Sequence, residues 1–451
     1  MIYFQNNNNN NKNKMNNKNL SRASILLSAV CFWLIPSIAV AADAEATQVI
    51  TNDTLKLIWI AICAILVLFM QAGFLLLEGG MVRSKNTINV VLKNFSDIGL
   101  GTIGFWIFGF GVMYGANSTG WFGTDGFFPT YTDSGQTLTL LYQMMFAATA
   151  ATILSGAVAE RFSFLPYISG AFVITSLVYP VFGSWAWNDN GWLAQLGFYD
   201  AAGATVVHSI GGWCALGALA LIGPRSGRYS RKGAIHTIPG HNLPYVAIGG
   251  FILWFGWFGF NGGSVNDDFS NIGQILLNTH LGAIGGITGS ILWLTITRKG
   301  FYMTSIVNGA LGGLVSVTAG IDVMAPQFAL LSGLIGGVVV VTTTSLLNRL
   351  RIDDVVGAIP VHAFCGAWGT LAVGFFYQGD LFNLERIVAQ VIGIVMAFIW
   401  GVSISYCLFW TLNRITHIRV PTKFEQRGLD ISEHKEIGYS DFMTTHARAD
   451  V

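Results

Sequence analysis

Apolar stretches of about twenty residues recur along this chain and are separated by short polar loops. A hydrocarbon core about 30 Å thick requires about twenty residues of helix, because a helix rises about 1.5 Å per residue. Of the 451 residues, 53% are hydrophobic and only 10% are charged, whereas an average soluble domain has about 25% charged residues. The sequence therefore predicts an all-α membrane protein.

We expect eleven transmembrane helices, at approximately 54–80, 87–115, 137–160, 165–187, 202–223, 243–262, 272–297, 302–321, 326–347, 355–378 and 384–413. Alternate loops carry eleven basic residues, whereas the intervening loops carry only Arg386. Under the positive-inside rule, this asymmetry places the mature N-terminus outside and the C-terminus in the cytoplasm. We therefore expect a multi-pass protein of the cytoplasmic (inner) membrane.

The ends of the chain differ from its centre. Residues 1–42 combine an asparagine-rich tract with an apolar segment that ends in small residues, which predicts a disordered leader and a signal peptide cleaved near Ala42. The alternative is an uncleaved first helix, because the apolar run is long. Residues 43–415 form the predicted membrane domain, and the charged residues 416–451 form a cytoplasmic tail.

A repeated motif identifies a candidate site. Residues 200–208 and 354–362 both read D-x-x-G-A-x-x-V-H, and they open the fifth and tenth predicted spans. Spans 1–5 and 6–10 are therefore predicted to be two inverted five-helix repeats, followed by an eleventh helix. Asp354 is the structural repeat partner of Asp200. Eight residues of helix advance each motif histidine by about 12 Å, so His208 and His362 should meet near the midplane. Inverted repeats around a midplane site are typical of transporters.

Other interpretations of the two histidines stay open from the residues alone. A membrane histidine can be an interhelical hydrogen-bonding group, and two imidazoles can hold a haem, for which His280 is a further candidate ligand. No nucleophile or metal-ligand set accompanies the histidines, so the sequence predicts no enzyme activity, no cofactor and no metal. A formal net charge of +1 gives no reason to expect nucleic-acid binding.

The remaining intramembrane charges are expected to be structural. Lys93 and Asp97 are four residues apart, so they can form an ion pair on one helix face. Glu78 lies at the end of the first span, near the basic residues Arg83 and Lys85. Asp200 can cap the N–H groups at the start of the fifth span or supply a negative potential to a cation.

Several sequence blocks carry a family resemblance. These are AGFLLLEGGMVRSKN (72–86), AVAERFSF (157–164), DAAGATVVH (200–208), GWFGFNGGS (256–264), DDVVGAIPVHAFCGAWGT (353–370) and RGLDISEH (427–434). From about residue 50 to about residue 440, the chain resembles the ammonium transporters of the Amt, Mep and Rh group. The resemblance implies an eleven-helix fold, a homotrimer, and one narrow pore per protomer in which His208 and His362 are the paired pore histidines.

The resemblance also assigns residues near the outer end of the pore. Phe146 and Phe260 match the stacked rings of the outer gate. Trp187 and Ser264 match an ammonium-recruitment site, to which Asp200 would add negative potential. The loop around Trp187 departs from the commonest spacing, so Trp185 is a possible substitute.

The implied function is ammonium transport, with NH₄⁺ recruited at the outer aromatic site, deprotonated, and passed as ammonia along the two histidines. In the tail, Gly428, Leu429, Asp430 and His434 match a regulatory segment that couples protomers and docks a PII-type regulatory protein. Lys435 stands where the family usually has glycine, and Gly438 where it often has alanine. Two other functions stay open, an ammonium sensor and an Rh-type gas channel.

Overall fold

The computed structural model describes residues 52–264 and 269–440. The predicted leader and signal peptide, residues 1–42, lie outside the described residues. The compact unit that carries the membrane helices is Lys56–Val451. Within its described part the chain is helical, apart from loops and three isolated β-bridges.

The helices follow one another in a single series. In chain order they are α2 (Asn52–Met81), η1 (Ser84–Asn86), α3 (Thr87–Ser96), η2 (Asp97–Gly101), α4 (Thr102–Gly104), η3 (Phe105–Gly109), α5 (Phe110–Tyr114), α6 (Ser134–Val158), α7 (Phe164–Val173), η4 (Ile174–Val178), α8 (Tyr179–Trp187), α9 (Trp192–Gln195), η5 (Ala204–Ser209), α10 (Ile210–Ile222), α11 (Leu243–Gly262), η6 (Phe269–Asn271), α12 (Ile272–Ile296), α13 (Met303–Thr318), α14 (Pro326–Arg349), η7 (Ile359–Phe364), α15 (Cys365–Phe376), α16 (Leu384–Ile415), α17 (Thr422–Arg427) and η8 (Asp430–His434).

The described residues contain 10 helices or continuous helical runs that are long and apolar enough to cross a membrane. The shorter apolar helix α13, with 16 residues, accounts for the eighth of the eleven predicted spans. The prediction of an all-α membrane protein is therefore confirmed. Several spans contain π-helical turns, which shift the side chains that follow relative to a regular α-helix.

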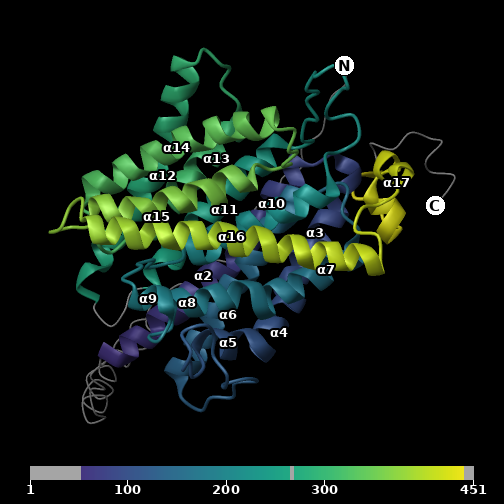
Figure 1. Ribbon diagram of the computed structural model, residues 1–451. Helices are drawn as coiled ribbons and strands as arrows, with labels where there is room; N and C mark the ends of the chain where they lie inside the picture. Colours follow the sequence, from purple (N-terminus) through teal and green to yellow (C-terminus); the bar gives the residue numbers. More distant parts are fainter. Residues whose placement is uncertain (1–51, 265–268, 441–451) are drawn as a thin grey trace, which may run out of the picture. The chain divides into compact units, whose positions relative to one another are not determined.

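Small residues allow the membrane helices to pack closely. Helices α12, α13 and α14 lie side by side (Figure 1). A methyl group added at Gly286 of α12 would overlap the backbone of α13, and one added at Gly285 would lie 2.5 Å from the Leu330 carbonyl oxygen of α14. Close backbone approach increases van der Waals contact where lipid supplies no hydrophobic driving force between helices.

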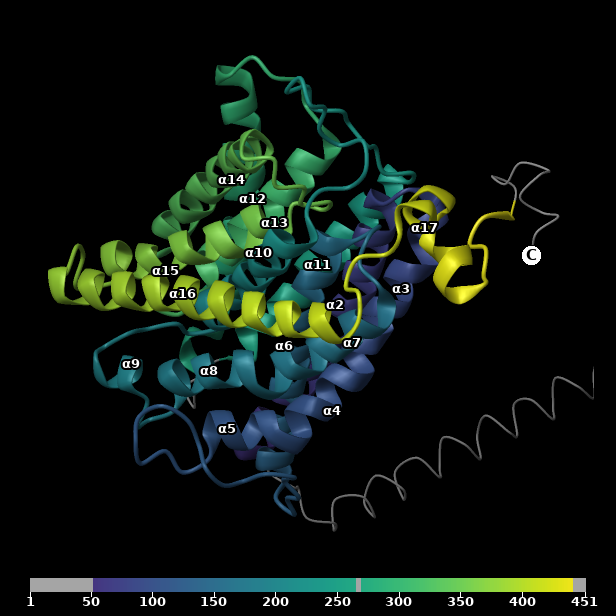
Figure 2. The same ribbon diagram turned by 45° about the vertical axis from the view of Figure 1, so that its right-hand side comes forward.

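The C-terminal part of the chain returns to the beginning of the membrane unit. The long helix α16 crosses the bundle, α17 follows it, and η8 then lies beside α3 (Figure 2). This contact brings the predicted regulatory segment against the loop that joins the first two spans.

The predicted ion pair between Lys93 and Asp97 does not form. Lys93 Nζ instead donates to the Phe162 carbonyl oxygen at 3.1 Å, and Asp97 accepts a hydrogen bond from the Tyr167 hydroxyl at 2.7 Å. The reason is that each buried side chain has a partner on the segment after α6, although the Asp97 N–H still bonds the Lys93 carbonyl oxygen as in a regular helix.

Candidate functional site

The two copies of the motif share their local structure. Both Asp200 oxygens accept backbone N–H groups at 2.8–2.9 Å, from Gly203, Ala204, Thr205 and Val206. Asp354 accepts the equivalent bonds from Gly357, Ala358 and Ile359. The fourth bond is missing in the second copy because Pro360, which takes the place of Val206, has no N–H group. Each carboxylate thus caps the helical segment that carries a histidine.

The backbone conformation explains why both copies of the motif contain a glycine. Gly203 has φ +99° and Gly357 has φ +79°, in the left-handed region where a side chain is strained. These residues turn the chain from each aspartate into the π-helical turns η5 and η7. The two turns carry His208 and His362.

Glycines four residues after each histidine let the two segments cross. A methyl group at Gly212 would lie 2.6 Å from the Ala363 backbone nitrogen, and one at Gly366 would overlap the Ala204 carbonyl oxygen. As a result, Nδ1 of His208 lies 3.2 Å from Nδ1 of His362. The prediction that the two imidazoles meet is confirmed, and both rings are buried.

A column of aromatic rings continues from this pair. The Phe146 and Phe260 rings stack with centroids 4.0 Å apart and an interplanar angle of 9°. Phe260 in turn stacks on His208 at 5.1 Å, and Trp257 covers the His208 ring at 4.9 Å. The two phenylalanines predicted as a gate thus lie next to His208, and His208 Nε2 is buried without a hydrogen-bond partner.

The residues predicted for ammonium recruitment surround Phe146. The Trp187 ring is 6.3 Å from the Phe146 ring, and its Nε1 donates to the Asp200 carbonyl oxygen at 2.6 Å. Ser264 Oγ donates to the Phe260 carbonyl oxygen at 3.0 Å. Trp185 is instead buried in a separate aromatic cluster with Trp121, Trp192 and Trp400. Trp187 is therefore the tryptophan beside the stacked phenylalanines.

A cavity lies beside His362, among residues from several helices. It is lined by Phe74, Leu77, Glu78, Ile153, Leu253, Asn308, Leu311, Val356, Gly357, Ala358, Val361 and His362. The Glu78 carboxylate accepts a hydrogen bond from Asn94 Nδ2 at 3.0 Å, whereas Arg83 pairs with Glu160. Sequence analysis gave Glu78 only a structural role beside Arg83, so its place in this cavity was missed. The signal that could have found it is an ionisable residue within an apolar span.

The haem alternative does not fit this geometry. The two imidazoles touch through their Nδ1 atoms, which leaves no space for a haem between them. His280 is exposed and stacks on Trp254 at 5.2 Å, away from the pair. In the described ranges, no group of three or more His, Cys, Asp or Glu side chains could hold a metal ion.

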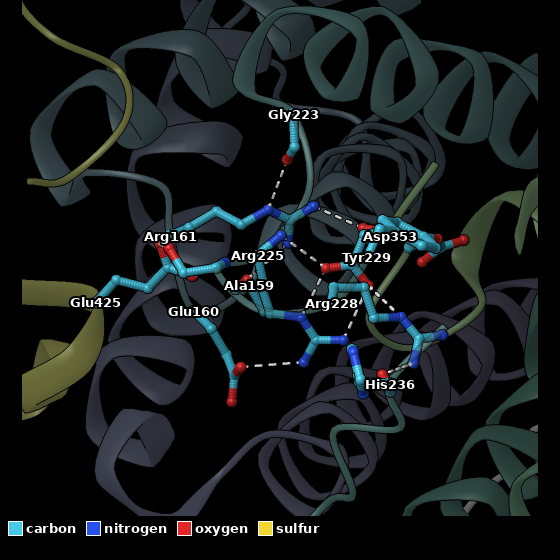
Figure 3. A network of polar contacts seen from close by, with 12 residues as sticks. Ala159, Glu160, Arg161, Gly223, Arg225, Arg228, Tyr229, His236, Asp353 and Glu425 are labelled. Carbon is cyan, nitrogen blue, oxygen red and sulfur yellow. Dashed lines mark hydrogen bonds and ion pairs between the residues drawn. The ribbon is translucent and has the colours of Figure 1, made fainter. Parts of the chain in front are cut away.

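Beyond the cavity, the loops between spans contain a network of buried charges (Figure 3). Arg225 pairs with Glu160 at 3.0 Å and with Asp353 at 2.8 Å. Arg83 also binds Glu160, and Arg228 also binds Asp353. Asp353 directly precedes the motif aspartate of the second repeat, so this network anchors the start of that motif.

The ion pairs change the acidity of these carboxyl groups. Burial by itself raises the pKa of Glu160, but the guanidinium groups of Arg225 and Arg83 more than offset this effect and lower the pKa to about 2. The same balance between burial and Arg225 holds the pKa of Asp353 well below its usual range. Both groups are therefore ionised at neutral pH.

The tail residues selected from the sequence pack against η1 and the first turn of α3. The Leu429 N–H donates to Asn86 Oδ1 at 2.9 Å, and Asp430 Oδ1 accepts from the Asn89 N–H at 2.9 Å. His434 Nε2 lies 2.9 Å from Asn89 Nδ2. Gly428 has φ +111° and leaves no room for a side chain beside Lys85.

Lys435, which stands where the family usually has glycine, has a backbone conformation that is typical of glycine. Lys435 has φ +60°, in the left-handed region that glycine adopts without strain. The tail therefore keeps the turn that a glycine would favour, although a lysine occupies it.

This fold and the paired buried imidazoles define a multi-pass membrane protein of the transporter class. Residues 58–439 match the Ammonium Transporter Family. The chain belongs to this family of transporters, which are not enzymes, and it is an ammonium transporter.

Individual relatives agree over most of the chain. It is 40% identical over 420 residues to ammonium transporter Amt2 of Archaeoglobus fulgidus, covering 86% of this chain and 89% of the relative. It is 40% identical over 402 residues to putative ammonium transporter sll0537 of Synechocystis, covering 85% and 73%. A solved structure named "Sensor Amt Protein" superimposes with a TM-score of 0.81 at 38% identity, covering 84% of this chain and 98% of that one.

Proposed function

We propose that this protein recruits NH₄⁺ beside Trp187, removes one proton, and passes ammonia along His208 and His362. The observation that carries this proposal is the direct contact between the two buried imidazoles, at 3.2 Å. Ammonium has about the size of a potassium ion, so selection for it must use its N–H groups and its removable proton. Imidazole nitrogens can accept and donate such protons.

Recruitment uses the groups around Phe146. The Trp187 and Phe146 rings offer cation–π attraction worth about 1–2 kcal/mol once the ion is partly desolvated. Ser264 Oγ has a lone pair that can accept an N–H bond, because its own proton is donated to the Phe260 carbonyl oxygen. Asp200 adds negative potential, although its oxygens are occupied by backbone N–H groups.

The gate favours loss of a proton over passage of the intact ion. The stacked Phe146 and Phe260 rings close the path next to His208 and provide no hydrogen-bond acceptor for a desolvated cation. Burying an unpaired ion costs several kcal/mol, whereas neutral ammonia loses much less hydration. The His208 nitrogen without a partner, Nε2, is the group that receives the proton.

The remaining assignments follow from the family and from the distribution of charge. We place the protein in the cytoplasmic membrane as a homotrimer, with the aromatic site outside and the basic loops inside. Residues 1–42 act as a cleaved leader, and residues 416–451 act as a regulatory tail. Its segment from Gly428 to His434 lies on the cytoplasmic face, where a PII-type protein could reach it.

The test is current on a supported membrane during an ammonium pulse, with a potassium pulse as a comparison. We expect a saturable ammonium-selective current that His208→Ala reduces at least tenfold. His280→Ala is the matched control, since this exposed histidine lies outside the pair. Equal currents from the His208→Ala and wild-type proteins would overturn the histidine relay.

An ammonium sensor is the second candidate function. It is supported by the similarity to the solved structure named "Sensor Amt Protein" over 98% of that chain. A sensor would bind ammonium without measurable flux. Saturable ammonium binding to the purified protein, together with no flux into proteoliposomes, would favour the sensor over the transporter.

A further inference from the structure

Glu78 is an acidic residue in an unfavourable place for an acid that only stabilises the fold. It lies in the last turn of α2, at the negative end of the helix dipole, and its side chain is 1% exposed. It forms no ion pair with any described lysine or arginine. A carboxylate buried in a membrane protein without an ionic partner indicates a functional role more often than a structural one.

The surroundings of Glu78 are suited to water. The cavity that Glu78 shares with His362 is large enough to hold a water molecule. Asn94, whose amide donates to the Glu78 carboxylate, has its Oδ1 atom buried without a hydrogen-bond partner. Because buried polar groups are normally paired, this atom is a further acceptor for a water beside Glu78, although Asn94 itself does not line the cavity.

The contact between the two imidazoles leaves one His362 nitrogen unused. His362 Nδ1 is in contact with His208 Nδ1, so only Nε2 of His362 is left to exchange a proton with another group. A proton that arrives through His208 must leave His362 from that nitrogen. Within the described cavity lining, Glu78 is the only carboxylate.

We propose that Glu78 is the proton acceptor that follows His362 in the transport path. This inference rests on the proposed histidine relay. The N–H bond at His362 Nε2 breaks as a cavity water accepts that proton, and the same water gives one of its own protons to the Glu78 carboxylate. The water is restored, an O–H bond forms on Glu78, and the proton leaves later to water or to ammonia, where a new N–H bond forms.

The charged neighbours of Glu78 are Lys93 of α3 and Asp97 of η2. Asn94 holds the carboxylate through its amide, and Lys93 is directed instead to the Phe162 carbonyl and the Tyr167 ring. Asp97 is held by the Tyr167 hydroxyl and does not line the cavity. Asp97 therefore offers a matched control, because it is another buried carboxylate close to Glu78 in the fold.

The experiment compares the wild type, Glu78→Gln, Glu78→Asp and Asp97→Asn in the same proteoliposomes. Glu78→Gln keeps the shape of the side chain but cannot take up a proton. We expect its ammonium-evoked current to fall at least tenfold, whereas uptake of ammonium nitrogen, measured with isotope-labelled substrate, changes less than twofold. Glu78→Asp should restore part of the current, and Asp97→Asn should retain all of it.

The possible outcomes distinguish a failure of the Glu78 relay from a failure of the transport function. Wild-type current from a Glu78→Gln protein that elutes as a monodisperse species would overturn the role of Glu78 and leave the transport function intact. Ammonium flux without any current in the wild type would do the same. If the wild type shows no ammonium flux, both the transport function and the Glu78 relay are overturned. Equal losses from Glu78→Gln and Asp97→Asn would assign both carboxylates to the fold.

Discussion

At the scale of single residues, the motif carboxylates position the histidines without touching them. Asp200 accepts four backbone N–H groups and Asp354 accepts three, because Pro360 lacks the fourth donor. Hydrogen bonds to a charged acceptor contribute about 1.5–3 kcal/mol each. The first copy of the motif should therefore depend on its aspartate more strongly than the second.

Replacing these aspartates by asparagine tests that difference. An amide keeps one acceptor oxygen but directs its NH₂ group at backbone donors, so Asp200→Asn should destabilise the protein by about 2–4 kcal/mol. Asp354→Asn should have a smaller effect. The measurement is the melting temperature of the detergent-solubilised protein. Asp380→Asn is the control, because this carboxylate is 48% exposed; a larger shift for Asp354→Asn than for Asp200→Asn would contradict the argument.

Residue spacing predicted that the two histidines meet, but it could not predict that Glu78 lies in the cavity beside His362. The D-x-x-G-A-x-x-V-H repeat predicts equal helical depth for the two imidazoles, and the crossing of the two segments at Gly212 and Gly366 then brings them into contact. The role of Glu78 depends on which helices face the end of α2, and sequence spacing does not report this. The same limit explains the Lys93 and Asp97 error, because their partners Phe162 and Tyr167 are distant in the sequence and belong to other elements.

At the scale of the elements, buried ion pairs connect the loops between spans. Glu160 follows α6, Asp353 follows α14, and Arg225 follows α10, so one guanidinium joins three separate segments. Replacing both partners of such a pair with apolar residues can be neutral, but removing one partner leaves a buried charge. Single substitutions in this network should therefore be costly.

Glu160→Gln should change the acid stability of the protein. The pKa of Glu160 is lowered from its ordinary value of 4.5 to about 2, which corresponds to about 3 kcal/mol at pH 7. Because the folded-state pKa is the lower one, this stabilisation is complete above about pH 4.5 and is lost as the pH falls toward 2. Melting temperatures across this range should fall more steeply for the wild type than for Glu160→Gln. Parallel curves would show that the pairs around Glu160 contribute little.

The docking of the tail depends on a second buried acid. Glu425 accepts hydrogen bonds from the Ser226 N–H at 2.6 Å and from the Ser226 hydroxyl at 2.9 Å. It also pairs with Arg419 at 2.9 Å. These contacts tie α17 to the loop after α10, and the contacts around Asp430 tie η8 to α3.

Glu425→Ala should release the tail. Loss of about 1.4 kcal/mol would increase the undocked population about tenfold. Limited trypsin digestion should therefore cut after Arg427 about ten times faster, as followed by mass spectrometry. Glu436→Ala is the control, because Glu436 is an exposed acid of the same tail. Equal cutting rates for Glu425→Ala and the wild type would mean that the Asp430 contacts hold the tail alone.

At the scale of the whole molecule, the two halves of the chain are joined where η5 and η7 cross. Hydropathy and loop charge were sufficient to predict the number and order of the spans, because these depend on composition along the chain. The crossing itself depends on backbone contacts between distant segments. In the sequence, the crossing is marked by Gly212 and Gly366, each four residues after a motif histidine.

Substitution of these glycines tests whether the crossing sets the distance between the histidines. Gly366→Ala would force η5 away from the start of α15, the helix that continues η7, because the added methyl group would overlap the Ala204 carbonyl oxygen. Gly212→Ala would crowd the Ala363 backbone nitrogen in the same way. A shift of about 1 Å would break the 3.2 Å contact between the imidazoles, because 3.2 Å is already near the upper limit of a hydrogen-bond distance.

We therefore expect both variants to lose at least tenfold in ammonium-evoked current while they still elute as monodisperse protein. Gly273→Ala is the matched control, because a methyl group there meets nothing within 4 Å. The distances predict the order of the effects, with Gly366→Ala more severe than Gly212→Ala. Full current from a folded Gly366→Ala protein would mean that the two halves separate without uncoupling the histidines, so that water rather than direct contact would have to connect them.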